Sequence, residues 1–166
     1  MTQQLTVGQK IVHRRYGAGT VVRVRKGRKD EEHERYYVID IPSRDLKVHL
    51  PTDSARSEEL RKLASLRKIR HALRILAEEP SELPRDYRER RAFVSELMTE
   101  GTVSSLAQII RDLCGRQRKK SMSTLESTML TNAKRQLAGE LALVQEIDLS
   151  QAMQRIEKAL QTDITK

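Results

Sequence analysis

The sequence predicts an α+β protein, with a small, strongly bent β-sheet or barrel first and a compact all-α region of about five helices after it. Residues 5–51 alternate apolar and polar side chains in short runs separated by turn residues, as half-buried strands do. From about residue 57 the apolar residues recur at three- and four-residue steps, as on one face of a helix. We therefore predict two domains, residues 1–53 and 54–166, divided where the period changes.

Four or five short strands are expected in the first domain, in the runs LTVGQKIVHR, TVVRVRK, RYYVIDI and LKVHL. Gly17 and Gly19 are interpreted as a tight hairpin turn, because a phosphate-binding loop would need a third glycine and a following helix. In VRVR, at 22–25, valine and arginine alternate, which places them on opposite faces of the strand. The arginine face is either a solvated outer face or part of an edge strand offered to a protein partner.

The second domain shows five amphipathic stretches. Gly101 ends the second of these predicted helices, and the polar segment GRQRKKS after the third is expected to be a loop. SerThrLeuGlu at 123–126 reads as a capping box. The expected starts are residue 57 for the first helix, Arg85 for the second, Thr102 or Ser104 for the third, Ser123 for the fourth, and Asp148 or Ser150 for the fifth.

Composition excludes several classes of protein. Lys and Arg outnumber Asp and Glu by 32 to 23, and this net charge of +9 is compatible with a polyanionic partner. With no apolar run of 18 residues and no basic-then-apolar N-terminus, we expect a cytoplasmic protein without a membrane-spanning segment. The single Cys114 and the four scattered histidines match no metal-ligand spacing, and no catalytic motif is present. We therefore expect no enzyme, no metal and no cofactor.

The segment PRDYRERR is the candidate nucleic-acid contact. Arginines neutralise phosphates, and a flat ring can stack on or wedge beside a base. Cations at a helix start oppose the helix dipole, and this misfit favours a functional role. The alternative is a solvated helix end with an ordinary, partly buried tyrosine. The predicted DNA-contacting residues are Arg85, Tyr87, Arg88, Arg90 and Arg91.

The whole chain resembles the CarD/CdnL family of bacterial RNA polymerase-binding transcription regulators. The matching stretches run from about residue 7 to 160 and are VGQKIVHRRYGAGTVVRV, YYVIDI, LKVHLP, PRDYRERR, VSSLAQIIRDL and MLTNAKRQLAGELALVQEID. The resemblance implies that residues 1–53 form a Tudor-like domain that docks on the β subunit of RNA polymerase. It also implies that residues 54–166 contact promoter DNA at the upstream edge of the transcription bubble and modulate open-complex stability.

The resemblance further implies roles for particular residues. Family members commonly carry a tryptophan wedge where this chain has Tyr87, so a weaker or different effect on open complexes is expected. The nearest candidates for polymerase contact are Arg25, Arg28 and His49. Because the protein would be tethered to the polymerase, weak and largely non-specific contacts with the promoter would be sufficient for function. The expected form is a monomer that is associated with the nucleoid through the polymerase. The alternative is an adaptor that docks on the polymerase and whose helices recruit another protein rather than DNA.

Overall fold

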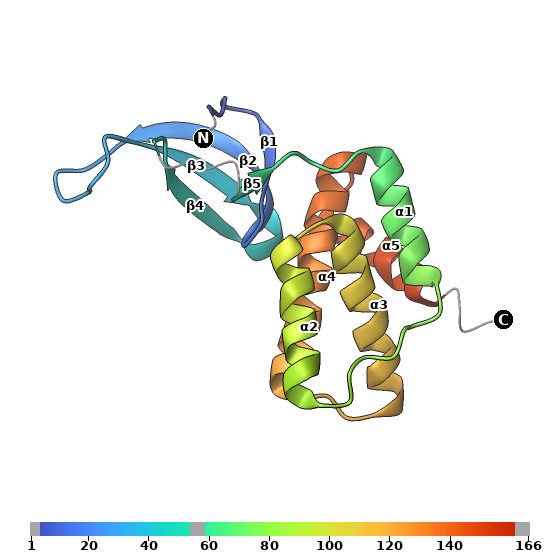
Figure 1. The fold of residues 1–166 in the computed structure, drawn as a ribbon. Coiled ribbons are helices and arrows are strands. Elements are labelled where there is room, and N and C mark those ends of the chain that lie inside the picture. The colour runs from blue at the N-terminus through green and yellow to red at the C-terminus, as the bar shows by residue number, and fades with distance from the viewer. Residues whose placement is uncertain (1–3, 54–58, 162–166) are drawn as a thin grey trace. The chain divides into compact units, whose positions relative to one another are not determined.

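The computed structural model describes residues 4–53 and 59–161 (Figure 1). The chain divides into two compact units, Met1–Leu63 and Ala64–Lys166. The first unit contains a five-stranded sheet and the second contains helices, which confirms the predicted α+β class. The division lies later than residues 53–54 because a short strand, β5 (Leu60–Arg61), pairs with the first strand and belongs to the sheet.

The sheet is antiparallel, with the strand order β4-β3-β2-β1-β5. Its other strands are β1 (Lys10–His13), β2 (Gly17–Lys26), β3 (Arg35–Ile41) and β4 (Leu46–Pro51), and a 3₁₀ turn (Pro42–Arg44) joins β3 to β4. Gly17 has φ of 107° where the chain turns into β2, which supports the predicted turn at this glycine. The prediction was wrong for Gly19, which has no positive φ and lies within β2, paired with Ile11 of β1. Gly19 lies against β3, where a Cβ would stand 2.4 Å from the Asp40 carbonyl oxygen.

A β-bulge between Val21 and Arg23 changes the faces of β2. Val21 is fully buried in the core of the sheet, whereas Val22 and Val24 are 42% and 43% exposed. The predicted alternation is therefore present, but the valines are largely exposed to solvent. On the arginine side, Arg23 is exposed and Arg25 is largely buried, so only part of this face is the solvated surface that one of the two sequence readings proposed.

The second unit contains five α-helices: α1 (Leu66–Ala77), α2 (Tyr87–Glu100), α3 (Val103–Lys119), α4 (Thr124–Gln145) and α5 (Leu149–Gln161). The prediction for the start of α1 was wrong, since this helix begins after the Ser65 N-cap rather than near residue 57. The predicted loop GRQRKKS was also wrong, because α3 continues to Lys119. Gly115 lies inside that helix and packs so closely on Pro80 that a Cβ would be 2.4 Å from the proline ring.

Helix α3 is the most buried element of the helical unit. It packs against α1, α2 and α4, and α5 closes the core against α1 and α4. Cys114 is buried in α3, as its place at the end of an apolar stripe predicted. No helix among the described residues is long and apolar enough to cross a membrane. In residues 4–53 and 59–161, no three His, Cys, Asp or Glu side chains are grouped to hold a metal ion.

Candidate binding surfaces

The predicted DNA-contacting segment forms the start of α2. The Asp86 side chain caps the helix by accepting a hydrogen bond from the Glu89 N–H at 3.0 Å. Tyr87 is therefore the first helical residue, and its side chain is 40% exposed. Of the four predicted arginines, three are exposed around it: Arg85, Arg88 and Arg91. We refer to Arg85, Tyr87, Arg88 and Arg91 as the α2 edge.

Arg90 corrects the prediction, because it is buried. Its side chain faces the protein, only 5% of the residue is exposed, and its Nε and Nη2 each lie 2.8 Å from the Glu126 carboxylate. Its Nη1 donates to the backbone carbonyls of Pro84 and Arg85, at 3.1 and 2.9 Å. All three nitrogens of this guanidinium thus contact partners within the fold and are not available to a phosphate, so Arg90 has a structural role.

Glu126 is the acidic partner that sequence reasoning missed. The first half of the predicted capping box is present, since the Ser123 hydroxyl accepts from the Glu126 N–H at 3.1 Å. The carboxylate, however, is only 5% exposed and faces Arg90, with the Arg116 Nε at 3.9 Å on its other oxygen. The pair joins the start of α2 to the start of α4.

Arg90 also supports the exposed ring. Its guanidinium carbon lies 5.6 Å from the centroid of the Tyr87 ring, within the range of a cation–π contact. The same guanidinium holds the two carbonyls that precede the helix. The buried Arg90–Glu126 ion pair therefore holds the α2 edge in place, while the side chains of the α2 edge are exposed.

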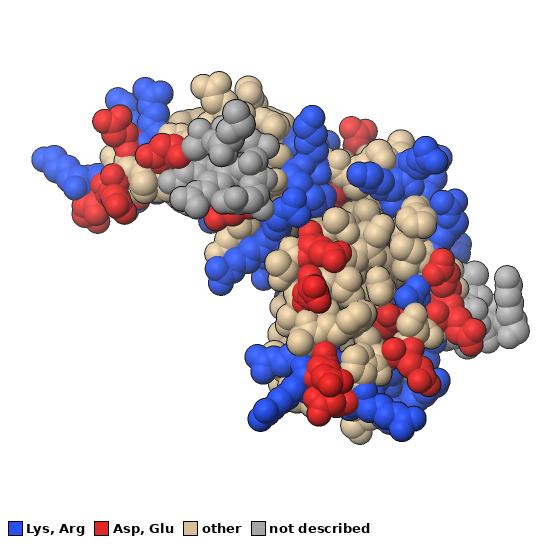
Figure 2. Space-filling model, viewed as in Figure 1, with Lys and Arg blue, Asp and Glu red and all other residues tan. Residues whose placement is uncertain are grey.

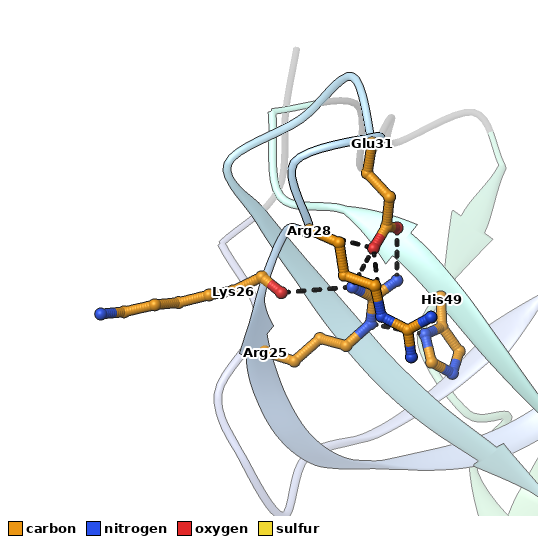
Figure 3. Close-up of polar contacts among 5 residues, drawn as sticks. All are labelled: Arg25, Lys26, Arg28, Glu31 and His49. Atoms are coloured by element: carbon orange, nitrogen blue, oxygen red, sulfur yellow. Dashed lines mark hydrogen bonds and ion pairs between the residues drawn. The ribbon is translucent and has the colours of Figure 1, made fainter.

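The three residues predicted for polymerase contact come together at the tip of the β2–β3 hairpin (Figure 3). The Arg25 guanidinium makes two hydrogen bonds to the Glu31 carboxylate, at 2.9 and 2.8 Å, and its Nε donates to His49 Nδ1 at 2.7 Å. The register pairs Arg25 with Tyr36, and the guanidinium carbon lies 4.3 Å from that ring's centroid. We call Arg25, Arg28, Glu31 and His49 the hairpin cluster.

Charge in the hairpin cluster is partly compensated. The hydrogen bonds from Arg25 lower the pKa of Glu31 to about 2, with smaller contributions from the Arg28 backbone N–H and the nearby positive charges. Burial, followed by the charges of the neighbouring arginines, lowers the pKa of His49. The Arg28 side chain is 81% exposed and only loosely paired, with its Nε 3.9 Å from Glu31. Arg28 is therefore the cation of this cluster that a partner can reach most directly.

One side of β2 is open next to this cluster. Strand β1 pairs with β2 only from Gly17 to Thr20, and the last bonds on that side join Val21 to Gly8 and Gln9, at 2.7 and 2.9 Å. From Val22 to Lys26, no residue that the structure describes pairs with this side of the strand. Although β2 is an inner strand by order, its second half is thus an edge among the residues that the structure describes, as one of the two sequence readings proposed.

Two family models match the chain over these units. Residues 5–64 match a model described as CarD-like/TRCF RID domain, and residues 71–157 match one described as CarD, C-terminal domain. A protein of Bacillus subtilis (strain 168), named "Putative transcription factor YdeB", is 26% identical over 141 residues, which cover 85% of this chain and 92% of that protein. The first match spans the sheet, and the second runs from within α1 to within α5.

Proposed function

Because the chain belongs to the CarD family of transcription factors, we propose that it regulates transcription by docking on RNA polymerase and contacting promoter DNA. In this proposal the sheet unit binds the β subunit of the polymerase. The helical unit contacts DNA at the upstream edge of the transcription bubble and modulates the stability of the open complex. No cofactor is needed for either contact, and a monomer suffices.

The open edge of β2 is the observation that carries the docking proposal. Five consecutive residues, 22–26, leave one side of their backbone unpaired by the described chain, and such an edge can accept a strand from a partner by β-augmentation. Val22 and Val24 project from this same stretch and are exposed, so they offer apolar side-chain contact beside the backbone pairing. A natural protein usually protects an edge like this one unless a partner uses it.

The hairpin cluster supplies charge at the end of that edge. Arg28 is exposed and can pair with a carboxylate of the polymerase, whereas Arg25 is already held by Glu31. A charge-assisted contact of this kind would fix the register of the added strand. We therefore assign to Arg28 the direct contact with the polymerase. We assign to Arg25 and His49 the role of positioning the hairpin tip that carries Arg28.

The α2 edge supports the DNA proposal. Three exposed arginines surround a 40% exposed ring, so phosphates could be neutralised while the ring contacts an opened base step. Tyrosine is smaller than the tryptophan common at this position in the family, and the wedge must offset an unstacking cost of a few kcal/mol. We therefore expect a shorter open-complex lifetime than Tyr87→Trp would give, and a further decrease for Tyr87→Ala.

The docking proposal is tested by retention of RNA polymerase on the tagged full-length chain. Arg28→Glu should reduce retention strongly. Lys62→Glu is the matched control, because it makes the same charge change at an exposed lysine of the first unit that follows β5 and lies outside the hairpin cluster. Equal retention by both variants would contradict the assigned docking surface.

The adaptor is the second candidate function. It is favoured by two exposed apolar side chains of the helical unit, Phe93 and Leu125, each 37% exposed, which suit a protein partner better than a phosphate backbone. Salt dependence separates the two functions. DNA contact through arginines gives a steep fall of affinity with salt, whereas an adaptor gives a shallow one for DNA.

A further inference from the structure

Helix α1 carries a row of cations that the proposed function does not use. Its buried face consists of Ile69, Ala72 and Leu76. Its exposed face carries Arg67, Arg70, His71 and Arg74 at three- and four-residue steps, with Lys68 beside them. We call these five residues the α1 row. Figure 2 shows Lys and Arg side chains along α1, with acidic side chains beside its lower, C-terminal end, where the helix is capped by Glu78.

The Lys and Arg side chains of the α1 row are not balanced by acidic partners in the part of the chain that the structure describes. Neither α1 nor its N-cap contributes an Asp or Glu, and its four Lys and Arg side chains make no ion pair with any residue in 4–53 or 59–161. Other helices of the unit do pair their charges, as Lys134 of α4 does with Glu157 of α5 at 2.8 Å. The absence of partners is thus a property of α1 and not of the whole helical surface.

The positive charges of the α1 row destabilise helix α1. Like charges three and four residues apart repel each other, and Arg67 and Lys68 lie in the first turn, where the helix dipole favours anions. Neutral or acidic residues at these exposed positions would serve folding better. A bound polyanion would remove both costs at once.

We propose that the α1 row binds the phosphate backbone of double-stranded DNA, as a contact separate from the α2 edge. The seven steps of helix from Arg67 to Arg74 rise about 10 Å. A duplex presents one phosphate charge per ~1.7 Å of its axis, so a row of this length faces several phosphates at once. Arginine suits this role, because its guanidinium can donate two hydrogen bonds to one phosphate.

An acidic protein surface fits the α1 row less well. Protein interfaces depend on a few buried aromatic or large apolar anchors. The exposed face of α1 has no Phe, Tyr or Trp, and its one exposed large apolar side chain, Leu66, stands at the very start of the helix. A row of charge without an anchor suits a uniform phosphate backbone and predicts no base preference.

The test is a salt titration of duplex binding with the full-length chain, followed by fluorescence anisotropy. The first variant combines Arg67→Gln, Arg70→Gln and Arg74→Gln, which keeps good helix formers on the surface. The matched control combines Arg135→Gln, Arg155→Gln and Lys158→Gln, which removes the same charge from exposed sites of α4 and α5. In thermal unfolding, the α1 variant should be at least as stable as the wild type, because the substitutions remove like-charge repulsion, and the control should unfold close to the wild type.

Each phosphate contact contributes about 0.9 to the slope of log affinity against log salt. The α1 variant should therefore lower that slope by about 2 to 3, while the control leaves it nearly unchanged. Equal loss in both variants would show a general effect of net charge and would overturn the proposal. Competition between duplex DNA and a poly-glutamate peptide provides a second check. If the peptide displaces DNA from the α1 row as well as unlabelled duplex does at equal total negative charge, the row recognises negative charge alone and the proposal is overturned.

A third variant, Arg88→Gln with Arg91→Gln, keeps the two DNA contacts distinguishable. If the slope falls for this variant and not for the α1 variant, the α1 proposal fails and the α2 edge stands. If the slope falls only for the α1 variant, the α1 row binds DNA and the α2 edge does not. A wild-type chain that binds no duplex at about 50 mM salt would overturn both.

Discussion

Breaking the Arg90–Glu126 pair should destabilise the helical unit and release the α2 edge. We consider Glu126→Gln, which keeps the shape of the side chain and removes its charge. Both partners are at least nine-tenths buried, with 6% and 5% of their side chains exposed, and Arg90 makes two 2.8 Å contacts to the carboxylate. The variant would leave an arginine charge buried without its counter-ion.

The expected cost follows from that burial. Losing one partner of a buried ion pair costs about 3–5 kcal/mol, compared with about 0–1 kcal/mol for an exposed pair. At roughly 4 °C per kcal/mol for a domain of this size, the melting temperature of the helical unit should fall by about 12–20 °C. Replacing both partners, as in Arg90→Met with Glu126→Leu, should recover much of this loss.

Thermal unfolding followed by the helical circular dichroism signal measures the effect. Glu157→Gln is the matched control, because the Lys134–Glu157 pair has the same 2.8 Å separation but is far more exposed. It should cost less than about 1 kcal/mol. If Glu126→Gln costs no more than Glu157→Gln, the pair does not hold the start of α2, and the reasoning about the α2 edge is refuted.

Three further predictions concern the sheet unit. Gly19→Ala should cost about 1–3 kcal/mol, measured by chemical denaturation, because its Cβ would collide with the Asp40 carbonyl oxygen. Burial lowers the pKa of His13 in the folded protein. The contribution of this histidine to stability is therefore complete above about pH 6.5 and is lost as the pH falls through its folded-state pKa. Chemical denaturation at several pH values should show a weaker pH dependence of stability for His13→Gln than for the wild type. Arg25→Gln should return the pKa of Glu31 from about 2 toward its ordinary value of 4.5, measured by NMR titration, and an unchanged pKa would contradict the hairpin cluster.

Local patterns in the sequence predicted the architecture well. The change from a two-residue to a 3.6-residue period indicated a sheet followed by helices, and Gly101 ends α2 in the left-handed conformation that a C-terminal glycine favours. The sequence did not show β5, because a two-residue strand has no period to detect. Nor could it show that α3 continues past Gly115, where packing against Pro80 favours a residue without a side chain.

The candidate sites were harder to predict, because they depend on contacts between distant residues. Arg90 lies in the same run as Arg88 and Arg91, but its counter-ion is 36 positions away in another helix. Likewise, alternation alone places Val22 and Val24 on one face of the strand without saying whether that face is buried, and in the structure both valines are exposed after the bulge. The α1 row was not predicted from the sequence, and its lack of ion-pair partners among the described residues is a property of the three-dimensional structure.

Footprinting of polymerase–promoter complexes tests the central claim most directly. The wild-type chain should be retained with the polymerase and add protection at the upstream edge of the bubble. Arg88→Gln with Arg91→Gln should keep the retention and lose the protection. Retention by the wild-type chain without any added protection would contradict the DNA contact and favour the adaptor, and a wild-type chain that is not retained would contradict docking itself.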